Sequence, residues 1–260
     1  MILFLALSAP ASPAKEDWRT RNSYHFVIYY KQNNFRYLDR LVNKAEDSYR
    51  LITQGLGFTR DKPWIWDERA AIYVYGTKEE FLATADVPEW SAGYARPFAK
   101  EIHTYNDSND FLDHIIVHEL THIIFREFVG NSDVPVWLDE GLATYMERKQ
   151  YVVQLKNKTG YFLKHDQFID FERFLAMDRG ELGGEVKPED EIKGTSFPER
   201  FYLQAYSLVY FLFNEFPKYK FVEFLRKVKK EGSFDAAFYK VYWALRDNAG
   251  LEARWRKYYD

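Results

Sequence analysis

One apolar stretch that carries two histidines and a glutamate constrains this chain more than any other feature. Residues 111–128 predict a largely buried helix, whose first turn Asp110 can cap and which Gly130 follows. Its apolar side chains recur at helical spacing, at positions 112, 115, 116, 120, 123, 124 and 128. Burying His118, Glu119 and His122 there without partners would cost roughly 1 to 3 kcal/mol per unsatisfied group. A compensating metal ion is therefore the simplest interpretation.

The spacing of these residues suits metal chemistry. Residues four apart lie on one helix face, so the imidazoles of His118 and His122 can reach one ion. Glu119 then projects beside the ion, where it can take a proton from a bound water. His114 lies one turn earlier, but three histidines spread over about 12 Å cannot share one ion, so we expect His114 to be a surface or supporting residue. The alternative is a helix that carries these residues by accident.

A second helix offers a third ligand. It is predicted to begin at Pro135 and to run through Trp137 and Tyr145 towards Lys149. Glu140 follows His122 by 140 − 122 = 18 positions. A turn and an antiparallel return of the chain would bring Glu140 back beside His122.

These residues resemble a known enzyme group. The His118–His122 pentapeptide and the Trp-Leu-Asp-Glu-Gly run that contains Glu140 are similar to the gluzincin metallopeptidases, which include thermolysin and the aminopeptidase N family, and most similar to their minimal peptidase MA-like members. The resemblance covers most of the chain. It implies Zn²⁺ as the cofactor, with His118, His122 and Glu140 as its ligands and Glu119 as general base.

Two departures from the resembling families stand out. Thr144 occupies the place where the thermolysin branch has an aspartate that supports a ligand histidine, so Asp139 or another residue is expected to substitute. The Gly-x-Met-Glu-Asn run, by which aminopeptidases hold a free amino terminus, is absent. The resemblance therefore leaves both endopeptidase and exopeptidase action open.

The resemblance also implies a substrate strand. Ala92, Gly93 and Tyr94 are similar to the strand that pairs with extended substrates in gluzincins, and Gly93 would let a peptide backbone come close. An ordinary edge strand is the alternative.

Two tyrosines compete as donor to the oxyanion of the reaction. Tyr202 and Tyr206 lie one turn apart on a predicted helix. The run resembles an aminopeptidase N segment in which a catalytic tyrosine opens a helix and a small residue, here Ala205, follows three positions later. This favours Tyr202, with a purely structural role in an aromatic core as the alternative for each.

The remaining periodicity predicts an α+β fold. Strands are expected at residues 25–30, 70–75, 91–95 and 100–105, with a helix at 35–51. Thr77 and Glu80 form a capping box that predicts the start of a further short helix. Residues 15–150 would form a zincin-like catalytic domain with a small mixed sheet and the zinc-site helices. A loop at 178–194 and helical periods at 201–216, 221–230 and 234–255 predict a helical C-terminal subdomain over 151–260.

Composition excludes several other classes of protein. The 260 residues include no cysteine, which excludes disulfides and thiolate chemistry. A net charge of −3 gives no basic footprint for nucleic acid. Residues 1–14, an apolar run followed by small residues, are interpreted as a signal peptide remnant with cleavage after Ala11 or Ala14, which predicts export to the periplasm or the medium. A frayed terminus or an anchor stub is the alternative, and no membrane span is expected in the mature chain.

Together these features predict an exported zinc metallopeptidase that acts on a peptide or protein substrate. The rival is a non-proteolytic zinc-containing binding or scaffold protein of the same fold. A metal hydrolase with a different substrate is a third reading. A site with three protein ligands and a carboxylate beside them favours catalysis, because structural zinc sites usually fill all four positions with protein.

Overall fold

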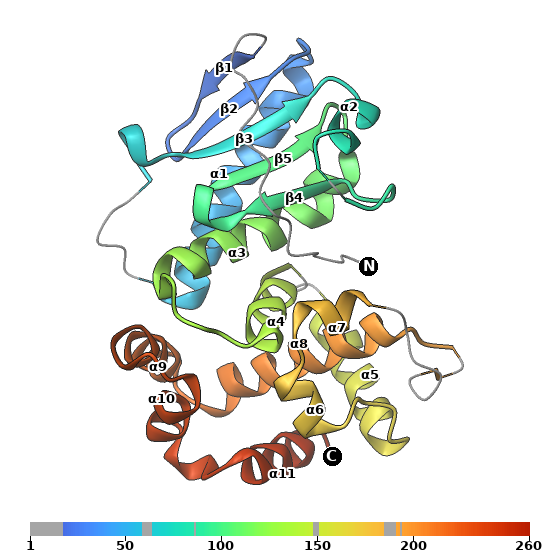
Figure 1. Ribbon diagram of the computed structural model, residues 1–260, viewed down its shortest axis with the longest axis vertical. Coiled ribbons are helices and arrows are strands. Elements are labelled where there is room, and N and C mark those ends of the chain that lie inside the picture. The colour runs from blue at the N-terminus through green and yellow to red at the C-terminus, as the bar shows by residue number, and fades with distance from the viewer. Residues whose placement is uncertain (1–17, 59–63, 86, 148–150, 185–190, 193) are drawn as a thin grey trace. The chain divides into compact units, whose positions relative to one another are not determined.

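The computed structural model describes residues 18–58, 64–85, 87–147, 151–184, 191–192 and 194–260 (Figure 1). The described chain forms two compact units, residues 18–128 and Val129–Asp260. We call them the sheet unit and the helical unit. The predicted signal segment at residues 1–14 lies outside the described residues. The predicted domain boundary at residue 150 stays a prediction.

Within the described residues, the sheet unit holds one five-stranded mixed sheet in the order β1-β2-β3-β5-β4. Pairs β2–β3 and β3–β5 are parallel, whereas β1–β2 and β4–β5 are antiparallel. The strands are β1 Arg19–Asn22, β2 Phe26–Tyr30, β3 Ala70–Tyr75, β4 Gly93–Arg96 and β5 Glu101–Tyr105. The four predicted strands are confirmed within one or two residues, and only β1 was not anticipated.

One face of the sheet carries a ladder of stacked rings. Tyr29, Tyr73, His103 and Tyr94 lie directly opposite one another on β2, β3, β5 and β4. Successive ring centroids are 4.8, 4.9 and 4.7 Å apart, and the rings lie nearly parallel. Such cross-strand aromatic pairs stabilise the register of a sheet. His103 therefore has a structural place in this ladder.

In its described residues the sheet unit also holds three α-helices: α1 Phe35–Leu56, α2 Lys78–Leu82 and α3 Ile116–Val129. Figure 1 shows α1 on one side of the sheet. Asn34 caps α1 by accepting from the Tyr37 backbone N–H, and Gly57 ends it with φ 73°. For α2, the predicted cap is confirmed, because Thr77 accepts from the Glu80 backbone N–H.

The start of the α3 helix differs from the prediction. Asp110 was expected to cap its first turn, but it has helical dihedral angles and makes no capping bond. Asn109 and Asp110 are already helical, before the predicted start at residue 111. Residues Phe111–Ile115 then form a π-helical turn that leads into α3. Such wide turns often occur at functional sites.

The helical unit is built from eight helices within its described residues. They are α4 Val136–Glu147, α5 Val152–Lys164, α6 Phe171–Ala176, α7 Arg179–Gly183, α8 Phe197–Glu215, α9 Lys218–Glu231, α10 Phe234–Val241 and α11 Asn248–Tyr259. Among all helices that the structure describes, we find none with the length and apolar character that crossing a membrane requires.

Two expectations for this unit need correction. The predicted loop at 178–194 contains α7, which Asp178 caps by accepting from the Glu181 backbone N–H. The periodic stretch at 234–255 is broken after α10 by a 3₁₀ turn, Trp243–Leu245, and by Arg246 at φ 68°. Capping chemistry and a left-handed residue outweigh the apolar period at these points.

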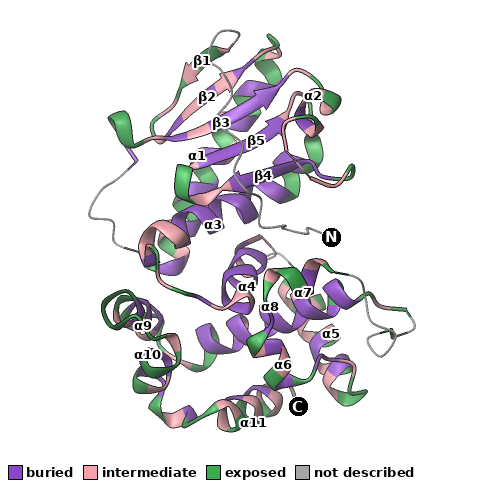
Figure 2. Cartoon of the chain, in the orientation of Figure 1, coloured by how far each residue is buried: buried purple, intermediate pink, exposed green. Residues whose placement is uncertain are grey.

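The contact between α4 and α8 forms the centre of the helical unit. Most of α8 is buried (Figure 2). A Cβ at Gly141 would stand 2.6 Å from the Ala205 carbonyl oxygen and 2.9 Å from a Val209 methyl group. Glycine inside a helix costs about 1 kcal/mol relative to alanine, so its presence here is explained by the close approach of the two helices. Gly141 thereby fixes the position of its neighbour Glu140 within the unit.

Candidate metal centre

The two histidines of α3 lie next to each other, as their spacing predicts. The ring centroids of His118 and His122 are 4.8 Å apart, with the ring planes at 74°. Both side chains are buried, at 1% and 4% exposure, and Glu119 is completely buried. His114, in contrast, is exposed on the π-helical turn, in agreement with the expectation that it is not a ligand.

The surroundings of these residues on α3 are apolar. Leu120, Ile123 and Phe125 are completely buried. The Thr121 hydroxyl donates to the Val117 carbonyl oxygen at 2.7 Å, so it is satisfied within its own helix. His118, Glu119 and His122 are thus buried on a helix whose neighbouring buried side chains are mostly apolar.

Glu140 lies on α4 and has an ionic partner that the sequence did not reveal. The Arg179 guanidinium donates to Glu140 Oε1 at 2.6 Å and to Asp139 Oδ2 at 2.7 Å. Burial alone would lower the pKa of Arg179, but the charges of Glu140 and Asp139 outweigh it and raise that pKa. One guanidinium therefore bridges both carboxylates.

His118, His122 and Glu140 make up a buried group of a composition that could hold a metal ion. Each offers one ligand atom, and these atoms lie within 4.8 Å of one another. Two imidazole nitrogens and a carboxylate oxygen are the donor set of many catalytic zinc sites.

The sequence predicts that Asp139 or another residue replaces the supporting aspartate whose position Thr144 occupies. Asp139 is engaged by Arg179. Thr144 is buried, and its hydroxyl has no hydrogen-bond partner among the described residues. Asp139 thus belongs to the ionic network around Glu140, whereas Thr144 does not.

The structure distinguishes the two candidate tyrosines. Tyr206 is fully buried between the rings of Tyr145 and Tyr210, burial raises its pKa, and its hydroxyl has no hydrogen-bond partner among the described residues. Tyr202 is only half-buried and lies near enough to Arg179 to influence the pKa of that residue. Tyr202 thus shares the neighbourhood of Arg179 in the helical unit, while Tyr206 belongs to the aromatic core.

The predicted substrate strand lies at an edge of the sheet. β4 pairs only with β5 among the described strands. A Cβ on Gly93 would meet the Phe111 ring at 2.5 Å, so packing against that ring already explains the glycine. Ala92 accepts from the Thr104 hydroxyl at 2.8 Å, and Tyr94 stacks on His103. The role of these residues in substrate binding stays a prediction.

Comparisons with known proteins find a family profile and a solved structure that are similar to this chain. A sequence profile of a family described as "Protein of unknown function (DUF1570)" matches residues 114–235, which include every candidate ligand as well as Arg179 and Tyr202. No curated protein matches the chain. Among solved structures, it is similar to yeast LTA4 hydrolase in complex with Bestatin, with 18% identity and a TM-score of 0.49. That similarity covers 90% of this chain but 38% of the hydrolase, so this chain spans well under half of that protein.

Proposed function

We propose that this protein is a zinc-dependent peptidase with a zincin-like catalytic fold. The observation that carries the proposal is the buried group of His118, His122 and Glu140, because two imidazoles and a carboxylate are a donor set typical of catalytic zinc. Glu119, next to His118 on the same helix, adds a carboxylate of the kind that a hydrolase uses as a base.

The chain's own residues have distinct parts in this proposal. His118 and His122, as neutral imidazoles, and Glu140, as a carboxylate, would hold the ion. When bound, zinc polarises a carbonyl group and lowers the pKa of water. Glu119 accepts the proton of the attacking water on its carboxylate and later gives it to the leaving amine. Arg179 positions Glu140 through the ion pair at 2.6 Å.

Two further groups would act on the peptide. Tyr202 is proposed to donate its O–H to the developing oxyanion, a contact made chiefly in the transition state. The edge strand β4 is proposed to pair with the extended backbone of the substrate. The half-buried state of Tyr202 and its vicinity to Arg179 support it over Tyr206.

A peptide library tests the proposal. Purified protein is incubated with a mixed peptide library, with a chelator, and with zinc added back after chelation, and the products are identified by mass spectrometry. The proposal expects cleavage that the chelator abolishes and zinc restores, and that Glu119→Gln lacks. Cleavage that resists the chelator would contradict it. A protein that retains zinc but cleaves no peptide would support the scaffold reading instead.

A further inference from the structure

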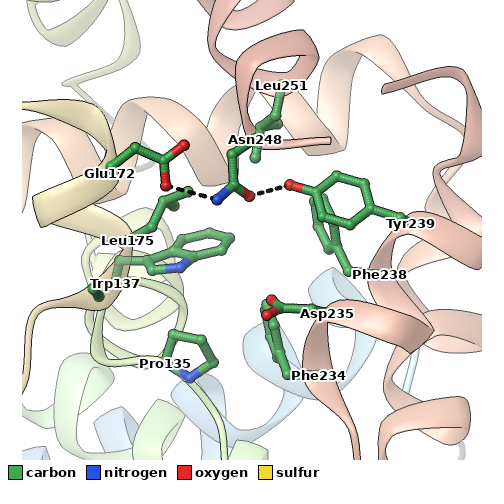
Figure 3. Close-up of a pocket in the computed structure, with 11 residues that line it drawn as sticks. Pro135, Trp137, Glu172, Leu175, Phe234, Asp235, Phe238, Tyr239, Asn248 and Leu251 are labelled. Atoms are coloured by element: carbon green, nitrogen blue, oxygen red, sulfur yellow. Dashed lines mark hydrogen bonds between the residues drawn. The ribbon is translucent and has the colours of Figure 1, made fainter. Parts of the chain in front are cut away.

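A second candidate site lies wholly within the helical unit. A pocket of about 150 Å³ opens between the start of α4 and the helices α6, α10 and α11 (Figure 3). Its lining combines aromatic rings with two acidic side chains and contains no Lys or Arg. None of the candidate zinc ligands or Glu119 contributes to it.

Aromatic rings form its walls. Trp137 meets Phe234 edge to face, with ring centroids 6.1 Å apart and planes at 88°. Phe234 in turn is nearly parallel to Phe238, with a centroid distance of 5.9 Å. Trp137 and Phe238 are each only 2% exposed, so these walls are fixed by the surrounding core. The negative faces of such rings attract cations.

Both acidic side chains that line the pocket, Glu172 and Asp235, are exposed. Asp235 is exposed on the first turn of α10 and forms no ion pair with any described residue. In Figure 3 its carboxylate points towards the space between Trp137 and Tyr239. Its position on the first turn also suits the helix dipole, but that role does not require it to face a pocket.

A directed chain of hydrogen bonds spans the other side of the pocket. The Tyr239 hydroxyl donates to Asn248 Oδ1, and Asn248 Nδ2 donates to Glu172 Oε2 at 2.8 Å (Figure 3). Glu172 can only accept, so the chain has one direction and ends on a negative charge. These hydrogen bonds join α10, α11 and α6. The carboxylates of Glu172 and Asp235 both line the pocket.

We propose that this pocket binds an organic cation, namely the alkylammonium or guanidinium group of a lysine or arginine side chain in a peptide. The aromatic rings would pack against the methylene stem of the side chain and attract its cationic group. The carboxylates of Asp235 and Glu172 would compensate the positive charge. A cavity of about 150 Å³ accommodates a benzene molecule, so the roughly five non-hydrogen atoms of a lysine side chain fit it. A bare divalent ion would find too few oxygen ligands among these rings.

Binding to small probes tests this inference without relying on catalysis. Calorimetric titrations of the full chain use Nα-acetyl-lysine amide, Nα-acetyl-arginine amide and the uncharged Nα-acetyl-norleucine amide. We expect the cationic probes to bind at least about tenfold more tightly than the norleucine probe. The preferred cationic probe identifies which side chain the pocket takes.

Matched variants locate the binding. Asp235→Asn should weaken the cationic probes about three- to tenfold, whereas Asp133→Asn should not, because it removes the same charge from an exposed position of the same unit outside the pocket. Thermal unfolding confirms that both variants fold. Equal binding of all three probes, an absence of binding to both cations, or an unchanged affinity in Asp235→Asn would each overturn the proposal.

Discussion

The two units bury their candidate ligands in different ways. On α3 of the sheet unit, His118 and His122 are surrounded by apolar side chains, which a neutral imidazole tolerates. On α4 of the helical unit, Glu140 is ion-paired with Arg179 from its own unit. A buried carboxylate needs such a partner, since an uncompensated charge is far more costly than a neutral ring. In the helical unit an ion pair therefore holds the candidate ligand, whereas in the sheet unit the helix spacing places the two candidate ligands next to each other.

The largest expected effect is on the sheet unit's chemistry. Glu119→Gln keeps the size and polarity of the side chain but cannot accept a proton. We expect peptide hydrolysis to fall by several orders of magnitude while the zinc content stays unchanged. Steady-state kinetics together with metal analysis measures both. Near-normal turnover would rule out Glu119 as the base.

The second-largest expected effect is on kcat, through Tyr202 of the helical unit. Tyr202→Phe should lower kcat by roughly 10² to 10³ with little change in KM, because the lost hydrogen bond forms chiefly in the transition state. Tyr206→Phe is the matched control and should change kcat much less, since Tyr206 is a core residue. The reverse ranking would transfer the role to Tyr206.

The ion pair itself is tested by changing Arg179. Arg179→Gln leaves Glu140 without its anchor, so zinc affinity should fall about 10- to 100-fold, and Arg179→Lys should lie between that variant and the wild type. Arg173→Gln is the control, because Arg173 pairs with Glu181 instead. Competition with a chelating dye measures the affinities. Tighter zinc binding in Arg179→Gln would mean that Arg179 competes with the metal for Glu140.

The smallest effect tests whether the sheet unit also anchors a carboxylate by hydrogen bonds. Burial alone would raise the pKa of Glu46, but hydrogen bonds from His25 and Ser23 outweigh it and lower that pKa from its usual value. The folded state thus favours the charged form, so its contribution is present above the unfolded pKa of about 4.3 and is lost as the pH falls through the lower folded pKa. Between pH 7 and pH 3, the free energy of unfolding should fall by about 1 kcal/mol more in the wild type than in Glu46→Gln. Parallel pH profiles of the two in urea unfolding would contradict this.

The sequence was informative where local geometry decides the outcome. A period of 3.6 residues places His118 beside His122 whatever the rest of the fold does. Strand and capping signals likewise predicted four strands and the Thr77 cap correctly. These features depend only on neighbours along the chain.

Features that depend on distant packing were not predictable. Arg179 pairs with Glu140 across 39 residues, and nothing in the local pattern points to it. Helical spacing could not separate Tyr202 from Tyr206, because the aromatic core around Tyr145 decides which of them is buried. From the sequence, Gly93 was interpreted as a position where a peptide backbone could come close. The fold shows that a Cβ there would meet the Phe111 ring at 2.5 Å.

The central claim is that His118, His122 and Glu140 bind one zinc ion. The most direct test is the zinc content of purified wild type, His122→Ala and Glu140→Ala, determined by inductively coupled plasma mass spectrometry after dialysis. The account predicts about one zinc per chain in the wild type and markedly less in each variant. Full zinc occupancy in Glu140→Ala would contradict it and move the third ligand elsewhere.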